Sequence, residues 1–141
     1  METSTVRNRL NLIIDNAKRL SAERRTRNDE ATRAFERFRE SCGVPLFKQV
    51  AGALKASGYP FTVFTPGGSV KLLSDKSAED YLEISLDTTG DQPAVVGHVS
   101  RARGRRVIES ERPIAIKPVA ELTEEDLLDY VLQEIGPFVE R

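Results

Sequence analysis

The sequence contains one cysteine, one histidine and no tryptophan. The lone Cys42 excludes an internal disulfide, and one cysteine with one histidine cannot supply the usual ligands of a structural zinc site. No apolar run approaches the ~18 residues of a membrane-spanning helix, and the N-terminus lacks an apolar signal core. We therefore expect no metal, no cofactor and no membrane contact, and a location in the reducing cytoplasm.

Catalytic motifs are missing as well. There is no Gly-x-Gly-x-x-Gly and no Gly-x-Ser-x-Gly, and the segment 67–71 (Gly-Gly-Ser-Val-Lys) has the wrong spacing for a phosphate-binding loop. His98 falls near the middle of an expected strand, where we expect it on a wet or partly packed face beside Glu or Arg. Because a catalytic thiol needs an adjacent base and nothing brings Cys42 to His98, we predict no catalytic residues.

The net charge of −1 hides an asymmetry along the chain. Residues 1–41 carry ten Lys/Arg and seven Asp/Glu, whereas residues 121–141 carry one Arg and seven acidic residues. A basic N-terminal arm and an acidic C-terminal helix could attract each other within a chain or between chains, subject to screening by salt. The charge of the whole molecule gives no support to general nucleic-acid binding.

What the sequence does contain is one long amphipathic pattern, from Val6 to Arg39. At 1.5 Å per residue a helix over this segment would be ~50 Å long, while a compact chain of this size is less than ~40 Å across. We infer that the helix projects, bends, or packs on a second molecule. Its apolar seam alternates steps of three and four residues, and the candidate self-association seam is Val6, Leu10, Ile13, Ala17, Leu20, Arg24, Arg27, Ala31, Phe35 and Phe38.

The middle of this helix is polar. Acid-first pairs four residues apart, such as Asp15 with Arg19 and Glu23 with Arg27, favour a continuous helix, but a break within residues 26–29 is the alternative. Ile14 beside the seam does not suit a parallel zipper, so an antiparallel or bundle-like arrangement is favoured. Arg24 and Arg27 on the seam are either solvated or paired with acids of a partner.

After Cys42-Gly43, which we expect to end the arm, a second helix should start near Val44 and stop at Gly58. Alternating apolar residues then predict an antiparallel meander of four or five strands, with Pro113 marking the last strand as an edge strand or a bulged strand. The expected strands are residues 61–65, 69–73, 82–87, 94–101 and 105–117.

The C-terminal helix has the clearest local signals. Thr123 caps it, Leu122 and Leu127 form a hydrophobic staple, and three acidic residues occupy its first turn. We expect its apolar face to lie across the sheet. That face comprises Leu127, Leu128, Val131, Leu132, Ile135 and Phe138.

Four arginines surround Gly104 at the tip of an expected hairpin. They repel one another and would gain from oxyanions, which the planar guanidinium fork binds bidentately. A solvated turn, a protein carboxylate partner and nucleic acid all stay open for this tip, although no aromatic residue is interleaved to stack on bases. The candidate anion or partner contacts are Arg101, Arg103, Arg105 and Arg106.

The sequence thus predicts an α+β protein with a long N-terminal helical arm, a short helix, a meander and a packed C-terminal helix. We expect residues 1–41 to mediate self-association, most simply as a homodimer, and residues 42–141 to form the α+β domain. The favoured function is a non-enzymatic interaction or scaffold module. A nucleic-acid-binding protein using the arginine hairpin, and a small-molecule binder or enzyme with a site between sheet and helix, are the alternatives.

Overall fold

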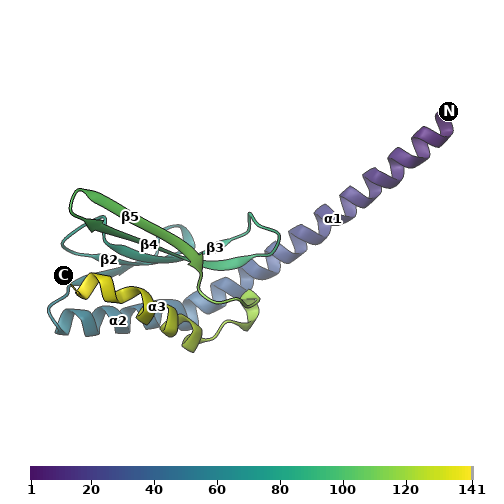
Figure 1. Cartoon of the computed structure of the whole chain (residues 1–141). Helices are drawn as coiled ribbons and strands as arrows, with labels where there is room; N and C mark the ends of the chain where they lie inside the picture. Colours follow the sequence, from purple (N-terminus) through teal and green to yellow (C-terminus); the bar gives the residue numbers. More distant parts are fainter. Residues whose placement is uncertain (141) are drawn as a thin grey trace. The chain divides into compact units, whose positions relative to one another are not determined.

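The computed structural model describes residues 1–140 of an α+β protein with three α-helices and one five-stranded antiparallel sheet (Figure 1). The chain divides into two compact units, Met1–Glu30 and Ala31–Arg141. The boundary between the units lies within the first helix and earlier in the chain than the predicted boundary at 41/42. The second unit therefore begins with the last helical turns of the predicted arm.

Helix α1 runs from Thr3 to Phe38 without a break, so the alternative of a break in residues 26–29 is not observed. The polar middle of the helix contains local side-chain bonds. Arg19 donates to Glu23 at 3.0 Å, one turn onward, instead of to Asp15 as predicted. The hydroxyl of Thr26 donates to the carbonyl of Ala22 at 3.1 Å. The Arg19–Glu23 pair, four residues apart, supports a helix that gains little from burial, whereas the Thr26 hydroxyl shares a carbonyl of the helix backbone and adds no such support.

The prediction that Cys42-Gly43 ends the helix is wrong. A π-helical turn, Arg39–Gly43, continues α1 directly into helix α2, Val44–Ala56, and the Val44 N–H donates to the carbonyl of Arg39 five residues back. Pro45 has no N–H to offer the preceding turn, and a widened turn is a common way for a helix to pass such a position. Gly43 is buried, and a Cβ there would lie in ordinary van der Waals contact with Val70 and Ile84, so the packing does not require a glycine at this position.

The end of α2 was predicted correctly at Gly58. Gly58 has φ +90° and donates its N–H to Lys55, while the Tyr59 N–H donates to Leu54 at 2.8 Å. These two bonds form a Schellman motif, which needs a residue with positive φ. The chain then turns back and enters the sheet at Phe61.

The sheet is a meander in which each strand pairs with the next, in the order β1-β2-β3-β4-β5. The predicted alternation of Leu82 and Ile84 toward the core is confirmed, since both are fully buried. The last strand ends at Pro113, whereas the predicted end was Lys117. The Ile114 N–H donates one more hydrogen bond to the Val95 carbonyl, and the chain bends away from the sheet after it. The strands are β1 Phe61–Phe64, β2 Val70–Ser74, β3 Tyr81–Asp87, β4 Ala94–Arg103 and β5 Arg106–Pro113.

Helices α2 and α3 (Glu124–Val139) lie on the same side of the sheet (Figure 1). The inner face of the sheet and the facing helices fill the layer between them with apolar side chains. Gly97 of β4 lies directly against Tyr130 of α3. The fully buried members of this core are Phe47, Val70, Leu72, Leu82, Ile84, Leu127 and Val131.

The cap of α3 is confirmed, but its apolar face is narrower than predicted. Thr123 and Asp126 form a capping box in which each side chain accepts from the other residue's backbone N–H. Leu132, expected in the core, is 59% exposed, whereas Tyr130 is 1% exposed. At 100° per residue Leu132 lies ~140° from the centre of the buried face, which is a position open to water.

Candidate interaction surfaces

The first candidate surface is the N-terminal half of the predicted seam on α1. Leu10 is 52% exposed and Ile13 66% exposed, and Val6, Ile14 and Leu20 are each more than 40% exposed. Val6, Leu10, Ile13, Ala17 and Leu20 recur every three or four positions and therefore share one face of the helix, and Ile14 lies at the edge of that face. Large aliphatic side chains grouped on one exposed helical face are typical of a surface that packs on another molecule. We call Val6, Leu10, Ile13, Ile14, Ala17 and Leu20 the arm stripe.

The C-terminal half of the same seam lies in the hydrophobic core of the second unit. Ala31, Ala34, Phe35 and Phe38 are each 5–8% exposed and belong to the buried cluster of the α+β domain. The structure therefore places Ala31, Phe35 and Phe38, which the sequence suggested for self-association, in contact with their own chain. One continuous heptad pattern has two different environments along its length.

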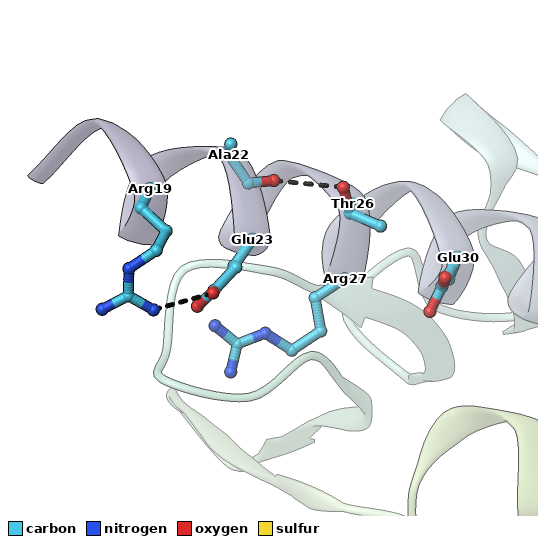
Figure 2. Close-up of a pocket in the computed structure, with 6 residues that line it drawn as sticks. All are labelled: Arg19, Ala22, Glu23, Thr26, Arg27 and Glu30. Carbon is cyan, nitrogen blue, oxygen red and sulfur yellow. Dashed lines mark hydrogen bonds and ion pairs between the residues drawn. The ribbon is translucent and has the colours of Figure 1, made fainter. Parts of the chain in front are cut away.

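Between these two halves, α1 is polar and carries a shallow hollow of about 530 Å³. Figure 2 shows its lining residues, which all come from this helix, with the Arg19–Glu23 ion pair and the Thr26–Ala22 hydrogen bond. The hollow is centred on a face of α1 ~140° away from the arm stripe, at 100° per residue. Because residues of one helix alone line it, and because they carry both signs of charge, the hollow is an open surface groove. The lining residues are Arg19, Ala22, Glu23, Thr26, Arg27 and Glu30.

Cys42 and His98 lie on opposite sides of the sheet, so the nucleophile pair considered from sequence is not formed. Cys42, next to the buried Gly43 on the helix side, borders a hollow of about 180 Å³. That volume is below the ~300 Å³ at which small-molecule pockets usually begin. Cys42 accepts a hydrogen bond from the neighbouring Ser41 hydroxyl at 3.6 Å.

His98 has the environment that the sequence suggested, on the open face of the sheet beside two glutamates. Its Nε2 lies 3.5 Å from Glu109 and its Nδ1 3.9 Å from Glu111. The imidazole stacks on Tyr81 with the ring centroids 5.7 Å apart, and Lys71 Nζ lies 4.0 Å from the centroid of the Tyr81 ring. Partial burial, followed by the negative charges of nearby glutamates, raises the pKa of Tyr81.

The second candidate surface is the β4–β5 hairpin with its four arginines. Gly104 occupies the first position of a two-residue turn with φ +63°, as a type II′ turn requires. Strand alternation places Arg101, Arg103 and Arg106 on one face, because Arg103 pairs with Arg106 across the ladder and Arg101 lies two residues earlier. Arg105 lies in the turn. Sequence reasoning found these four residues but not which of them share a face.

None of the helices within residues 1–140 combines the length and the apolar composition of a membrane span. The same part of the chain holds no group of three or more His, Cys, Asp or Glu residues arranged to bind a metal ion. A comparison with protein-family models gave no matching family, and comparisons with curated proteins and with solved structures gave no match either. The two surfaces must therefore be interpreted from their own chemistry.

Proposed function

We propose that this protein is a non-enzymatic interaction module that forms a homodimer through the arm stripe of α1. The observation that carries the proposal is the exposure of Leu10, Ile13 and Leu20 on one helical face, on the same seam that is buried from Ala31 onward. Full burial of an exposed Leu or Ile gains ~1.5–3 kcal/mol, and because these side chains are already about half buried, covering them with a partner gains roughly half of that each. A cytoplasmic location belongs to the proposal, since a lone cysteine suits a reducing compartment.

A second copy of the chain is the partner that the stripe fits, because the stripe is complementary to itself in an antiparallel register. In that register Leu10 packs on Leu20 of the partner subunit and Ile13 packs on Ala17 of the partner subunit. The two-fold axis then passes beside Ile14, which meets Ile14 of the partner subunit. Four apolar layers in succession result.

The same register gives Arg24 a place on the seam. Each end of the stripe brings Val6 against Arg24 of the partner subunit, whose aliphatic stem can cover the valine while its guanidinium group stays in water. A parallel pair would instead bring Arg24 against Arg24 of the partner subunit, with two like charges in one layer. The seam arginine therefore favours the antiparallel arrangement.

Charge beside the seam supports this register as well. The flanking residues place Arg9 beside Glu23 of the partner subunit, and the two-fold axis repeats this ion pair. A parallel pair would place Arg9 beside Ile14 of the partner subunit, with no ion pair there. The antiparallel register brings Glu2 near Glu30 of the partner subunit at its ends, where solvent screens the repulsion.

Light scattering of the full chain tests the proposal. We expect a dimer of the 15.7 kDa chain at micromolar concentration. The variant Leu10→Gln with Leu20→Gln should dissociate, because it removes both members of two apolar layers while keeping helix propensity nearly unchanged. We expect dimer affinity to fall more than about 100-fold.

The matched control is Leu12→Gln, because Leu12 lies on the same helix, is 70% exposed and falls outside the stripe. This variant should remain a dimer. A monomeric wild-type chain at tens of micromolar would rule out the proposal. Equal effects of the stripe variant and the Leu12→Gln control would contradict the assignment of the interface to the stripe.

A further inference from the structure

We propose that the tip of the β4–β5 hairpin is a binding site for double-stranded DNA, entering a groove as a two-stranded ribbon. This inference stands on the α+β unit alone and does not depend on self-association of α1. It gives a function to the arginine cluster, which the arm stripe leaves unexplained. We call residues 101–108 the arginine ribbon.

The arginine ribbon extends past the rest of the sheet. The last β3–β4 pair is Tyr81 with Ser100, so beyond Ser100 strand β4 has only β5 as a neighbouring strand. The ladder between these two strands continues to Arg103, which pairs with Arg106 on the other side of the turn. A ribbon of two antiparallel strands is one of the two elements that the major groove of B-DNA admits.

The ribbon's own side chains carry charge of one sign, and the carboxylate of Asp80 accepts a hydrogen bond from its backbone, at the Ala102 N–H, at 2.7 Å. Residues 101–108 include four arginines and no acidic residue. Arg103, Arg105 and Arg106 are exposed, and within residues 1–140 none of the three forms an ion pair. The neighbouring Arg112, by contrast, lies beyond the ribbon and pairs with Glu134 at 2.9 Å. The guanidinium groups at the tip are therefore not paired with carboxylates of the described residues and are available to bind an external anion.

The two faces of the hairpin differ, which orients the ribbon. Arg101, Arg103 and Arg106 share one face, while the opposite face carries Val107 and, further along, Glu109. Arg101 and Arg103 are ~6.6 Å apart along the strand, about two base-pair rises of 3.4 Å. Guanidinium forks spaced in this way can bond phosphate oxygens or guanine edges in succession.

Double-stranded DNA fits this surface better than single strands or an acidic protein. The ribbon from 101 to 108 contains no aromatic side chain, and aromatic stacking is the usual basis of single-strand binding. An acidic protein could also pair with the arginines. Such a partner would bind a wide sheet as well as a two-stranded ribbon, so it does not account for the projection of β4 and β5 beyond β3. A groove does require that shape, because a wider sheet could not enter it.

Fluorescence anisotropy with a labelled duplex of about 20 base pairs tests the inference, using the full chain at 50 mM salt. We expect binding that weakens roughly 100-fold between 50 and 200 mM salt, if each ribbon makes about four phosphate contacts. Arg103→Glu with Arg105→Glu should weaken binding at least about tenfold and lower the salt slope by about two per ribbon. Arg103→Lys with Arg105→Lys keeps the charge and should lose less.

The control is Lys48→Glu with Lys55→Glu, which reverses two exposed charges on α2. This control changes net charge equally, so it should bind DNA far better than the ribbon variant. Circular dichroism of each variant checks the fold. Absence of duplex binding at 50 mM salt, equal losses in the two charge-reversal variants, or a preference for single-stranded DNA would overturn the inference. Binding of polyglutamate with no binding of duplex would also overturn it and identify an acidic protein as the partner class.

Discussion

Tyr130 of α3 lies so close to Gly97 of β4 that a Cβ on Gly97 would overlap both Cζ and the hydroxyl oxygen of the tyrosine. Arg112 covers another part of the ring, with its guanidinium carbon 4.6 Å from the centroid. Within the described residues the hydroxyl is buried without a hydrogen-bond partner, and this burial raises the pKa of Tyr130. The contact joins the C-terminal helix to the centre of the sheet, and only a glycine permits it.

Gly97→Ala should therefore destabilise the α+β unit by about 3 kcal/mol, because the methyl group overlaps a ring that is itself packed from several sides. Urea denaturation followed by circular dichroism measures this loss. Gly52→Ala is the matched control, since Gly52 lies exposed in α2 and a Cβ there would meet nothing within 4 Å. That control should be neutral or gain about 0.5–1 kcal/mol. A Gly97→Ala variant as stable as the wild type would show that α3 does not approach β4 this closely.

This contact also marks the limit of prediction from the sequence. Period-two alternation in segments such as Leu82 to Leu86 was sufficient to predict the meander, and Thr123 with Leu127 was sufficient to predict α3. The pairing of Gly97 with Tyr130 could not be predicted, because it depends on how two distant elements meet. Gly43 shows a related difficulty, since glycine often ends a helix, whereas here the chain continues through a π-helical turn that local pattern does not predict.

The candidate surfaces were predictable to different extents. The heptad pattern identified one seam from Val6 to Phe38, but periodicity reports only that a face is apolar and not what covers it. The division into an exposed stripe and a buried segment beginning at Ala31 depends on where the sheet and α2 lie. The four arginines were visible in the sequence, whereas their common face and the extension past β3 depend on strand register.

The capping box of α3 predicts a dependence of stability on pH. Hydrogen bonds from Lys117 and from the backbone of Thr123 lower the pKa of Asp126. Because the pKa of this carboxyl is lower in the folded chain than its usual ~3.9, its contribution is present above that value and is lost as pH falls through the folded pKa. We expect Asp126→Asn to lower the Tm at pH 7 and the difference from wild type to shrink towards pH 2.

Asp129→Asn is the control for this experiment, because Asp129 is an exposed carboxylate on the same helix. Thermal melts of the three proteins between pH 7 and pH 2 provide the comparison. The wild type and Asp129→Asn should show parallel curves, with Asp126→Asn converging on both at low pH. A gap between wild type and Asp126→Asn that stays constant with pH would contradict a role for the charged carboxylate.

The antiparallel register that we propose for the arm predicts a specific response to charge reversal. Arg9→Glu places a second carboxylate beside Glu23 of the partner subunit, and Glu23→Arg places two guanidinium groups together, so each single variant should dimerise more weakly. Exposed ion pairs contribute ~0.2–1 kcal/mol each and the two-fold axis provides two, so we expect roughly a two- to thirtyfold loss at low salt. The double variant Arg9→Glu with Glu23→Arg should recover the wild-type affinity, as sedimentation equilibrium would show.

Mixing the two single variants makes the test sharper. Each homodimer of a single variant contains two like-charge contacts between positions 9 and 23. A heterodimer of Arg9→Glu with Glu23→Arg contains two opposite-charge contacts at these positions instead, so it should form in preference to either homodimer. Arg7→Glu is the control, because Arg7 lies beside Ser21 of the partner subunit in this register and should show no such preference. Glu23 also forms an ion pair with Arg19 in its own helix, and this pair is lost in both Glu23→Arg and the double variant. Its loss therefore cannot explain why the double variant regains dimer affinity. Dimers that respond equally to all of these changes would refute the register while leaving association through the arm stripe intact.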